Sequence, residues 1–291
     1  HALVSDNKGR VLLHAGNHNF QTFIRSSLKP FQAIPFISSG TSEKYNIDDK
    51  GIAVCCGSHS GSTLHAREVF KILWNASLDI DVLKCPIPKG AKSRLQNNCS
   101  GKHAAFLATC KKMTWPLDNY LDRKHPLQIE IIRIIAELLN MPAEEFITAK
   151  DDCGAPVPHL RLSQMASLYA KLSYSESPEL EKIKRAIIAN PSLIAGTGRF
   201  DTEVISRGHG QIISKGGSEG IQCICRVREG LGIAIKVEDG SKRAKHAVAL
   251  HILKQLEWLT PTALEELAEL SLDFKPGVKI EVIGDLNFQE T

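Results

Sequence analysis

The sequence predicts a mixed α/β fold, an antiparallel sheet flanked by helices with a further helical subdomain. Short apolar runs separated by turn residues gather near both ends of the chain, as strands do. The middle of the chain carries apolar residues at helical spacing instead. With 291 residues, of which 43% are hydrophobic, the chain can bury a sizeable core in one large domain or two intimate ones.

The expected strands begin with a hairpin. Residues 2–5 and 11–15 are strand-like and are joined by the turn Asp6-Asn7-Lys8-Gly9. The short apolar run at 52–56 is expected to be a strand that leads into a loop of small residues. The remaining strands are expected at 211–214, 221–228, 232–238 and 279–283.

The expected helices fill the segments between these strands. One of them, over 178–190, follows Ser177 and starts with proline, a cap and first-turn residue typical of a helix start. The others are expected at 26–39, 63–77, 102–113, 127–139, 163–172, 241–258 and 264–270. We expect a single catalytic domain over 1–291, and the Gly/Pro-rich stretch 154–158 is the candidate seam between subdomains.

Composition excludes several classes of function. The net charge is +4 without a block of like charges, so nothing favours binding to nucleic acid or a membrane surface. The sequence contains no run of about 18 apolar residues, so it predicts no membrane-spanning helix. The eight cysteines do not form a disulfide framework in a chain of this length. A reducing, cytoplasmic location is therefore the simpler expectation.

The most informative stretch is Arg25-Ser26-Ser27-Leu28-Lys29-Pro30-Phe31. Residues three apart on a helix share a face, so Ser26 and Lys29 can meet while Ser27 points elsewhere. A serine hydroxyl needs a base to become a nucleophile, and a lysine of lowered pKa can be that base. The alternative is a helix start with Ser26 as N-cap and Lys29 in solvent.

Two further segments place a serine or a lysine in a loop of small residues. The stretch Cys56-Gly57-Ser58-His59-Ser60-Gly61 offers Ser58 as a second nucleophile or a hydroxyl relay, or else is an ordinary turn. In Lys215-Gly216-Gly217-Ser218-Glu219-Gly220 the glycines let the backbone approach a ligand, with Lys215 facing it. A plain hairpin loop is the alternative there.

The last two segments carry cysteines. They are Asn98-Cys99-Ser100-Gly101-Lys102-His103, ahead of an apolar helix, and Asp151-Asp152-Cys153-Gly154-Ala155-Pro156. The carboxylates of the second suit a metal or an ammonium group. Two thiolates, from Cys99 and Cys153, suit zinc. Their spacing fits no established zinc pattern, so buried inert cysteines are the alternative.

Taken in order, these five segments resemble the bacterial asparaginases of the Rhizobium type, also called type III or the asparaginase II family. The resemblance extends over most of the chain. It implies a serine-β-lactamase-like fold, a homodimer, and an amidohydrolase that converts L-asparagine to L-aspartate and ammonia. The expected partner is therefore a small amino-acid amide, with no nucleic acid and no membrane.

The resemblance also implies roles for individual residues. Two Ser–Lys tandems fall on Ser26 with Lys29 and on Ser58 with Lys215. Positive charges close together depress lysine pKa values, which would make a neutral base available. We expect Ser26 to be the acylated residue and Ser58 to be the alternative. The resemblance further implies a zinc ion bound by Cys99, Lys102 and Cys153, and a substrate held by Arg25 at its α-carboxylate and by Asp151 at its α-amino group.

Other functions remain open at this point. A glutaminase or a penicillin-recognising hydrolase of the same fold shares the Ser-x-x-Lys motif and a Lys-Gly-Gly like theirs. Against the second of these stand the cysteines beside the site and the absence of a Ser-x-Asn motif in the middle of the chain. From another class, the chain could be an amino-acid-binding regulator without turnover, although the intact set of serines and lysines argues against this.

Overall fold

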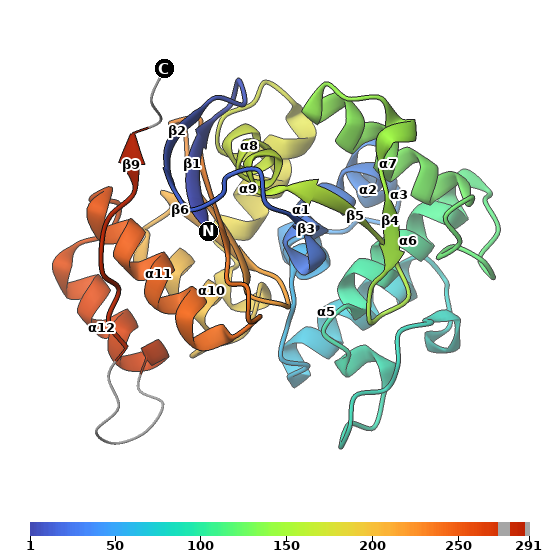
Figure 1. The fold of residues 1–291 in the computed structure, drawn as a ribbon. Helices are drawn as coiled ribbons and strands as arrows, with labels where there is room; N and C mark the ends of the chain where they lie inside the picture. The colour runs from blue at the N-terminus through green and yellow to red at the C-terminus, as the bar shows by residue number, and fades with distance from the viewer. Residues whose placement is uncertain (273–279, 289–291) are drawn as a thin grey trace. The chain divides into compact units, whose positions relative to one another are not determined.

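The structure is a computed structural model that describes residues 1–272 and 280–288 (Figure 1). The chain divides into two compact units. The first unit comprises His1–Ser27, His159–Ser175 and Thr197–Thr291, and the second comprises Leu28–Pro158 and Glu176–Gly196. One crossing between the units, at Pro158–His159, adjoins the stretch 154–158 that was expected to be a seam.

The first unit is built on a six-stranded antiparallel sheet with the strand order β6-β7-β8-β1-β2-β9. Its strands are β1 (Ala2–Asp6), β2 (Val11–Ala15), β6 (Ile212–Gly216), β7 (Ile221–Arg226), β8 (Leu231–Lys236) and β9 (Asn287–Phe288). The short strand β3 (Gln21–Phe23) pairs with residues 159–161 of β5 (Pro156–Arg161) in the same unit. The expected hairpin and the three-strand meander are confirmed.

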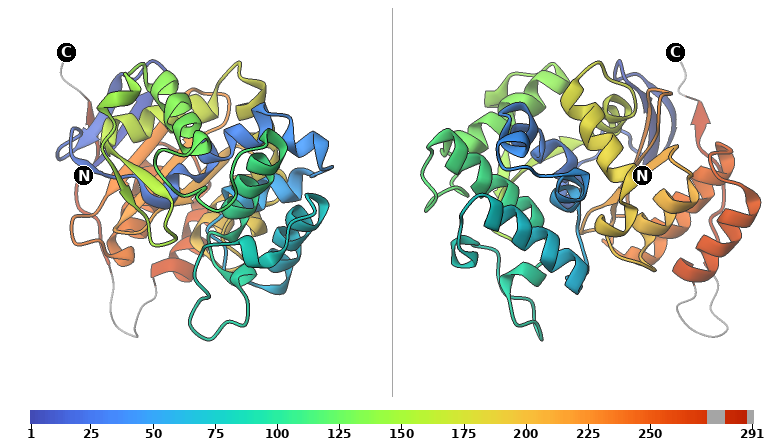
Figure 2. Two further views of the ribbon diagram at one scale, coloured as in Figure 1. Left: turned by 90° about the vertical axis from the view of Figure 1, so that its right-hand side faces the viewer. Right: turned by 180° about the vertical axis from the view of Figure 1, so that it is seen from behind.

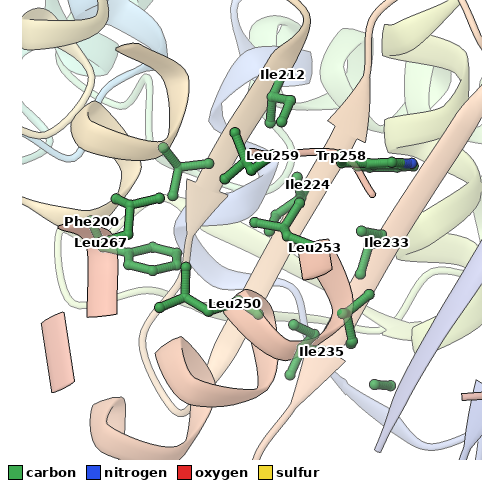
Figure 3. Close-up of a cluster of buried hydrophobic side chains, with 14 of the residues drawn as sticks. Phe200, Ile212, Ile224, Ile233, Ile235, Leu250, Leu253, Trp258, Leu259 and Leu267 are labelled. Atoms are coloured by element: carbon green, nitrogen blue, oxygen red, sulfur yellow. The ribbon is translucent and has the colours of Figure 1, made fainter. Parts of the chain in front are cut away.

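Helices cover both faces of this sheet. The helix α8 (Leu162–Ser173) packs on β1, β7 and β8. On the other face α10 (Phe200–Arg207), α11 (Lys242–Gln255) and α12 (Pro261–Leu272) enclose an apolar cluster. Figure 3 shows Ile212, Ile224, Ile233 and Ile235 of the strands meeting Leu250 and Leu253 of α11. The alternation of side chains along each strand thus lets one sheet support two layers.

The second unit is helical, and its helices can be followed in the two further views of the chain in Figure 2. Its helices are α1 (Lys29–Gln32), α2 (Ile34–Ser38), α3 (Thr41–Lys44), α4 (Asp49–Cys56), α5 (Thr63–Asn75), α6 (Ser100–Met113), α7 (Pro126–Leu139) and α9 (Pro178–Ala189). The helix α4 contacts α1, α5, α6 and α9 and is the centre of this packing. The strand β4 (Thr148–Lys150) pairs with residues 156–158 of β5.

Two sequence expectations are wrong. The run 52–56, expected to be a strand, is the end of helix α4, which starts after Asp48 because that side chain accepts the Gly51 N–H at 3.1 Å. All six residues from Gly51 to Cys56 are buried, so no polar face marks the helical period. The last expected strand, 279–283, is not observed over its described part, 280–283, and its first residue lies outside the described ranges.

The helix expected at 26–39 is a series of short segments. A 3-10 turn at Arg25–Leu28 is followed by α1 and α2, each with a proline in its first turn. Pro30 and Pro35 lack an N–H that could donate to a preceding turn, and each therefore stands in the first turn of a new short helix. Among the described helices, none combines the length and apolar character of a membrane span.

Candidate active site

The amine of Lys29 is the centre of a buried polar cluster in the second unit. Lys29 lies in the first turn of α1 with 0% of its surface exposed. Its Nζ donates to the carbonyl oxygens of Gly57 at 2.7 Å and Asn98 at 2.9 Å, and lies 3.0 Å from Ser58 Oγ. Three segments far apart in sequence therefore meet at one nitrogen.

These partners orient the lone pair of a neutral Lys29. A carbonyl oxygen can only accept, so the two protons of a neutral amine go to Gly57 and Asn98. In the ammonium form Nζ donates to Ser58 Oγ, and in the neutral form its lone pair can accept the hydroxyl proton of Ser58 instead. Burial lowers the pKa of Lys29, and the positive charge of Lys102 lowers it further, while Cys99 and Cys153 oppose this shift.

The loop that carries Ser58 is fixed from two sides. Its backbone N–H groups at Ser58 and Ser60 donate to Ile194 O at 2.7 Å and Ala195 O at 2.9 Å. The ring of His59 accepts the Gly61 N–H at Nδ1. Because Nδ1 accepts, Nε2 carries the ring proton of a neutral imidazole and donates to Ser100 Oγ at 3.1 Å. The loop is thereby tied to the first residue of α6.

The expected metal ligands also come together in the second unit. Lys102 Nζ donates to Cys153 Sγ at 3.3 Å, and this sulfur lies 4.0 Å from Asp151 Oδ2. The thiol of Cys99 donates to Asn98 Oδ1 at 3.0 Å. All three expected ligands are buried, at 3–4% exposure. The cluster adjoins Lys29, since Cys99, Lys102 and Cys153 all influence the pKa of that amine.

The charges in this cluster are unequally distributed. Interaction with Cys99 lowers the pKa of Cys153 well below its usual range although burial opposes the shift, and Lys102 lowers it further. The same contact with Cys153, together with burial, raises the pKa of Cys99. Burial lowers the pKa of Lys102, but the two cysteines and Asp151 raise it more. These shifts favour a thiolate at Cys153 beside an ammonium group at Lys102.

The start of α6 lies against α4 at Gly101. A Cβ built on this glycine would be 2.2 Å from Val54 O of α4, so any side chain here would collide with backbone. Cys99 and Lys102, at the start of α6, are therefore held against the helix whose end leads into the Ser58 loop.

The first unit holds the other expected site residues. Lys215 is on β6 with 1% exposure, and its Nζ donates to Gly216 O at 2.6 Å. Ser27 Oγ donates to Lys215 O at 2.9 Å, and the Tyr169 hydroxyl donates to Ser27 O at 2.7 Å. Ser27 is thus a structural link to the lysine strand.

Arg25 and Ser26 precede this link in a short 3-10 turn. Arg25 has a φ of +54°, a left-handed conformation that is uncommon for a residue with a side chain and concentrates at functional sites. Its Nη1 pairs with Glu219 Oε1 at 2.7 Å. Glu219 lies in the glycine-rich segment after Lys215, which links the Arg25 turn to the end of β6.

The geometry thus groups the predicted residues into two sets. Lys29, Ser58, Asp151 and the three expected metal ligands belong to the second unit, and Arg25, Ser26 and Lys215 to the first. The sequence pairs Ser26 with Lys29 and Ser58 with Lys215, whereas the hydrogen bond within the second unit joins Lys29 to Ser58. Sequence reasoning missed the carbonyls of Gly57 and Asn98, because a backbone acceptor carries no residue-type signal.

The family to which the chain belongs follows from a comparison of its sequence with models of known protein families. The family model described as L-asparaginase II matches residues 1–288. The chain belongs to the L-asparaginase II family. The resemblance drawn from the five motifs is therefore confirmed. No curated protein matches the chain. Membership in the L-asparaginase II family supports an asparaginase-like hydrolase.

The family resemblance implies zinc, and the donor set at the thiol cluster fits that metal. Two sulfurs and one amine are donors that zinc accepts, and the lowered pKa of Cys153 favours the thiolate that zinc binds. Lys102 must lose its proton to bind, which a dication at the cluster favours. Within 1–272 and 280–288 no three His, Cys, Asp or Glu side chains are grouped for a metal.

Proposed function

We propose that this protein is an L-asparaginase, an amidohydrolase that converts L-asparagine to L-aspartate and ammonia. The observation that supports the proposal is the buried Lys29 amine, which donates to two backbone carbonyls and lies within hydrogen-bond distance of the Ser58 hydroxyl. This is the arrangement that a serine hydroxyl requires to become a nucleophile.

The reaction begins with Lys29 in its neutral form. Lys29 accepts the proton of Ser58 Oγ. A serine alkoxide then attacks the side-chain amide carbon of asparagine, either as Ser58 itself or as Ser26 with Ser58 relaying its proton. A C–O bond forms, and the carbonyl π electrons move to the oxygen. When the carbonyl reforms, the C–N bond breaks and the lysine proton leaves with the nitrogen as ammonia. Water then hydrolyses the acyl-serine ester to aspartate and free serine.

The other residues bind and orient the substrate in this proposal. Arg25 pairs with the α-carboxylate, and Asp151 accepts from the α-ammonium group. Lys215 is the second lysine, and it is proposed as the partner base of Ser58. Cys99, Lys102 and Cys153 would hold a zinc ion, which supplies a positive charge and a Lewis acid when bound. We further propose a cytoplasmic homodimer, on the family resemblance and on eight cysteines that form no disulfide among the described residues.

Ammonia release from purified protein tests the proposal. We expect release from L-asparagine and much less from L-glutamine, although one methylene changes binding by only about 1–3 kcal/mol. Glutamine as the better substrate would indicate a glutaminase, and turnover of a chromogenic β-lactam would indicate a penicillin-recognising hydrolase. Binding of asparagine without ammonia release by folded protein would indicate a regulator. The variant Lys29→Arg is the control for contaminating activity.

A further inference from the structure

A buried carboxylate accepts hydrogen bonds from strand β6 on both sides of Lys215. Asp201, from α10, accepts the Ser214 hydroxyl at Oδ1 at 2.8 Å and the Gly216 N–H at Oδ2 at 2.8 Å. These are the residues immediately before and after Lys215. Gln222 Nε2, from the paired strand β7, donates to Oδ1 at 2.7 Å. One carboxylate therefore fixes the backbone from which the Lys215 side chain projects.

A second buried lysine completes this support. Lys245, from α11, has 5% exposure, and its Nζ donates to the carbonyls of Gly217 and Ile221, both at 3.1 Å. These carbonyls flank the glycine-rich turn between β6 and β7. A Cβ built on Gly216 would lie 2.9 Å from Lys245 Nζ and 3.3 Å from Asp201 Oδ2, so both charged groups face the same glycine.

We propose that Asp201 is a positioning residue for Lys215 that also serves as its counter-charge, and that Lys245 shares this counter-charge. The proposal deepens the function proposed above and rests on it for the role of Lys215. One carboxylate cannot fully neutralise two buried ammonium groups. Asp201 therefore favours the charged form of Lys215, and Lys245 weakens that preference, which leaves Lys215 able to give up its proton.

Other titratable groups of the described residues surround these three. Lys236 of β8 is also buried, and its Nζ donates to Glu219 O in the turn after β6. Burial lowers the pKa of His246 on α11 to about 4 and raises the pKa of Cys223 on β7 to about 12, so both are neutral near pH 7. Lys242 and Arg199 also act on Lys245, and Lys242 is exposed to solvent. Burial raises the pKa of Asp201, but Lys215, Lys245 and the hydrogen bonds lower it more, so Asp201 is ionised.

The test is a direct titration of Lys215 in the full-length protein. Lysine labelled with ¹³C reports its protonation through the Cε chemical shift, and loss of one signal in Lys215→Arg assigns it. Asp201→Asn removes the negative charge, so the pKa of Lys215 should fall. Lys245→Met removes a positive charge at nearly constant side-chain length, so the pKa of Lys215 should rise. Each shift should be about one unit or more, the scale for a nearby buried charge.

Opposite shifts of the Lys215 pKa in the two variants distinguish an electrostatic role from purely structural support of the strand. A loosened strand would shift this pKa in the same direction in both variants. Lys242→Met, an exposed lysine on the same helix, is the matched control and should leave the titration unchanged. Equal or same-direction shifts in folded Asp201→Asn and Lys245→Met would overturn the proposal. If only one variant folds, an absent or opposite shift in that variant overturns it. The titration uses no substrate, so its outcome is independent of whether asparagine is hydrolysed.

Discussion

Lys29 Nζ and Ser58 Oγ lie 3.0 Å apart although 29 positions separate the two residues in sequence. The contact depends on α4, which ends at Cys56 and delivers the Ser58 loop to the start of α1.

Lys29 and Ser58 should act as one catalytic unit. We expect Ser58→Ala and Lys29→Arg each to lower kcat for asparagine by about 10³-fold or more, because a guanidinium does not give up its proton. The double variant should be no worse than the poorer single one, since groups acting together are not additive. Steady-state ammonia release measures all three. Lys71→Arg, an exposed lysine of the same unit, is the control, and multiplicative losses in the double variant would contradict the pairing.

A reactive asparagine analogue should label one of two serines. Peptide mapping after trapping locates the acyl group. A label on Ser58 indicates direct attack by the serine that contacts Lys29, and a label on Ser26 indicates that Ser58 passes the proton on. A label at neither residue in an active preparation would contradict the proposed chemistry.

Activity should rise with pH on the side where Lys29 loses its proton. Burial lowers the pKa of this amine below its ordinary value, so the active neutral form gains population before a solvent-exposed lysine would. Below that pKa the ammonium predominates and kcat/KM falls with decreasing pH. The profile of kcat/KM against pH tests whether activity rises as Lys29 loses its proton. An acidic optimum, with activity lost as pH rises from neutrality, would be incompatible with a lysine base.

Metal content should depend on the thiol cluster. We expect about one zinc per chain in protein purified without chelator, the stoichiometry of a single Cys/Cys/Lys site. The Cys99→Ala, Cys153→Ala double variant should contain little zinc. Cys110→Ala, which removes a buried cysteine farther along α6, should retain the wild-type content. Elemental analysis decides, and equal zinc in all three proteins would place the metal elsewhere.

Arg25 should affect binding more than turnover. It is 12% exposed at its side chain and is paired with Glu219, which is 50% exposed. Arg25→Met should raise KM for asparagine by about 10–100-fold, the scale of one charged hydrogen bond of about 1.5–3 kcal/mol. Arg228→Met, an exposed arginine of the same unit, should leave KM unchanged. An unaltered KM in folded Arg25→Met would remove Arg25 from the substrate site.

Sequence reasoning predicts the fold where periodicity is clear. The meander β6-β7-β8 and the amphipathic helices α5, α7 and α9 are recognisable because one side of each element differs from the other. The helix α4 is not recognisable, since its last six residues are buried on every side. The segment 26–39 is helical as expected, but its two prolines divide it.

The sequence predicts which residues belong to the candidate site, but not which serine is hydrogen-bonded to which lysine. Spacing indicates that Lys29 follows Ser26 by one helical turn, yet the hydrogen bond of Lys29 is to Ser58. Only tertiary structure brings α4 and α1 together, and no local pattern encodes that approach. Asp201 and Lys245 carry no motif at all. Their importance follows from burial of charge beside strand β6, which a sequence does not display.

The contact between Gly101 and Val54 O has a consequence for how the site responds to damage. Because α6 and α4 touch backbone to backbone there, displacement of the cysteine-bearing helix start would be transmitted to the helix that delivers Ser58. Oxidation of Cys99 would then displace the Ser58 loop, although no direct hydrogen bond between Cys99 and Ser58 is described. Because Gly101 has no side chain, the helix that begins at the thiol cluster and the helix that leads into the serine loop are in direct backbone contact.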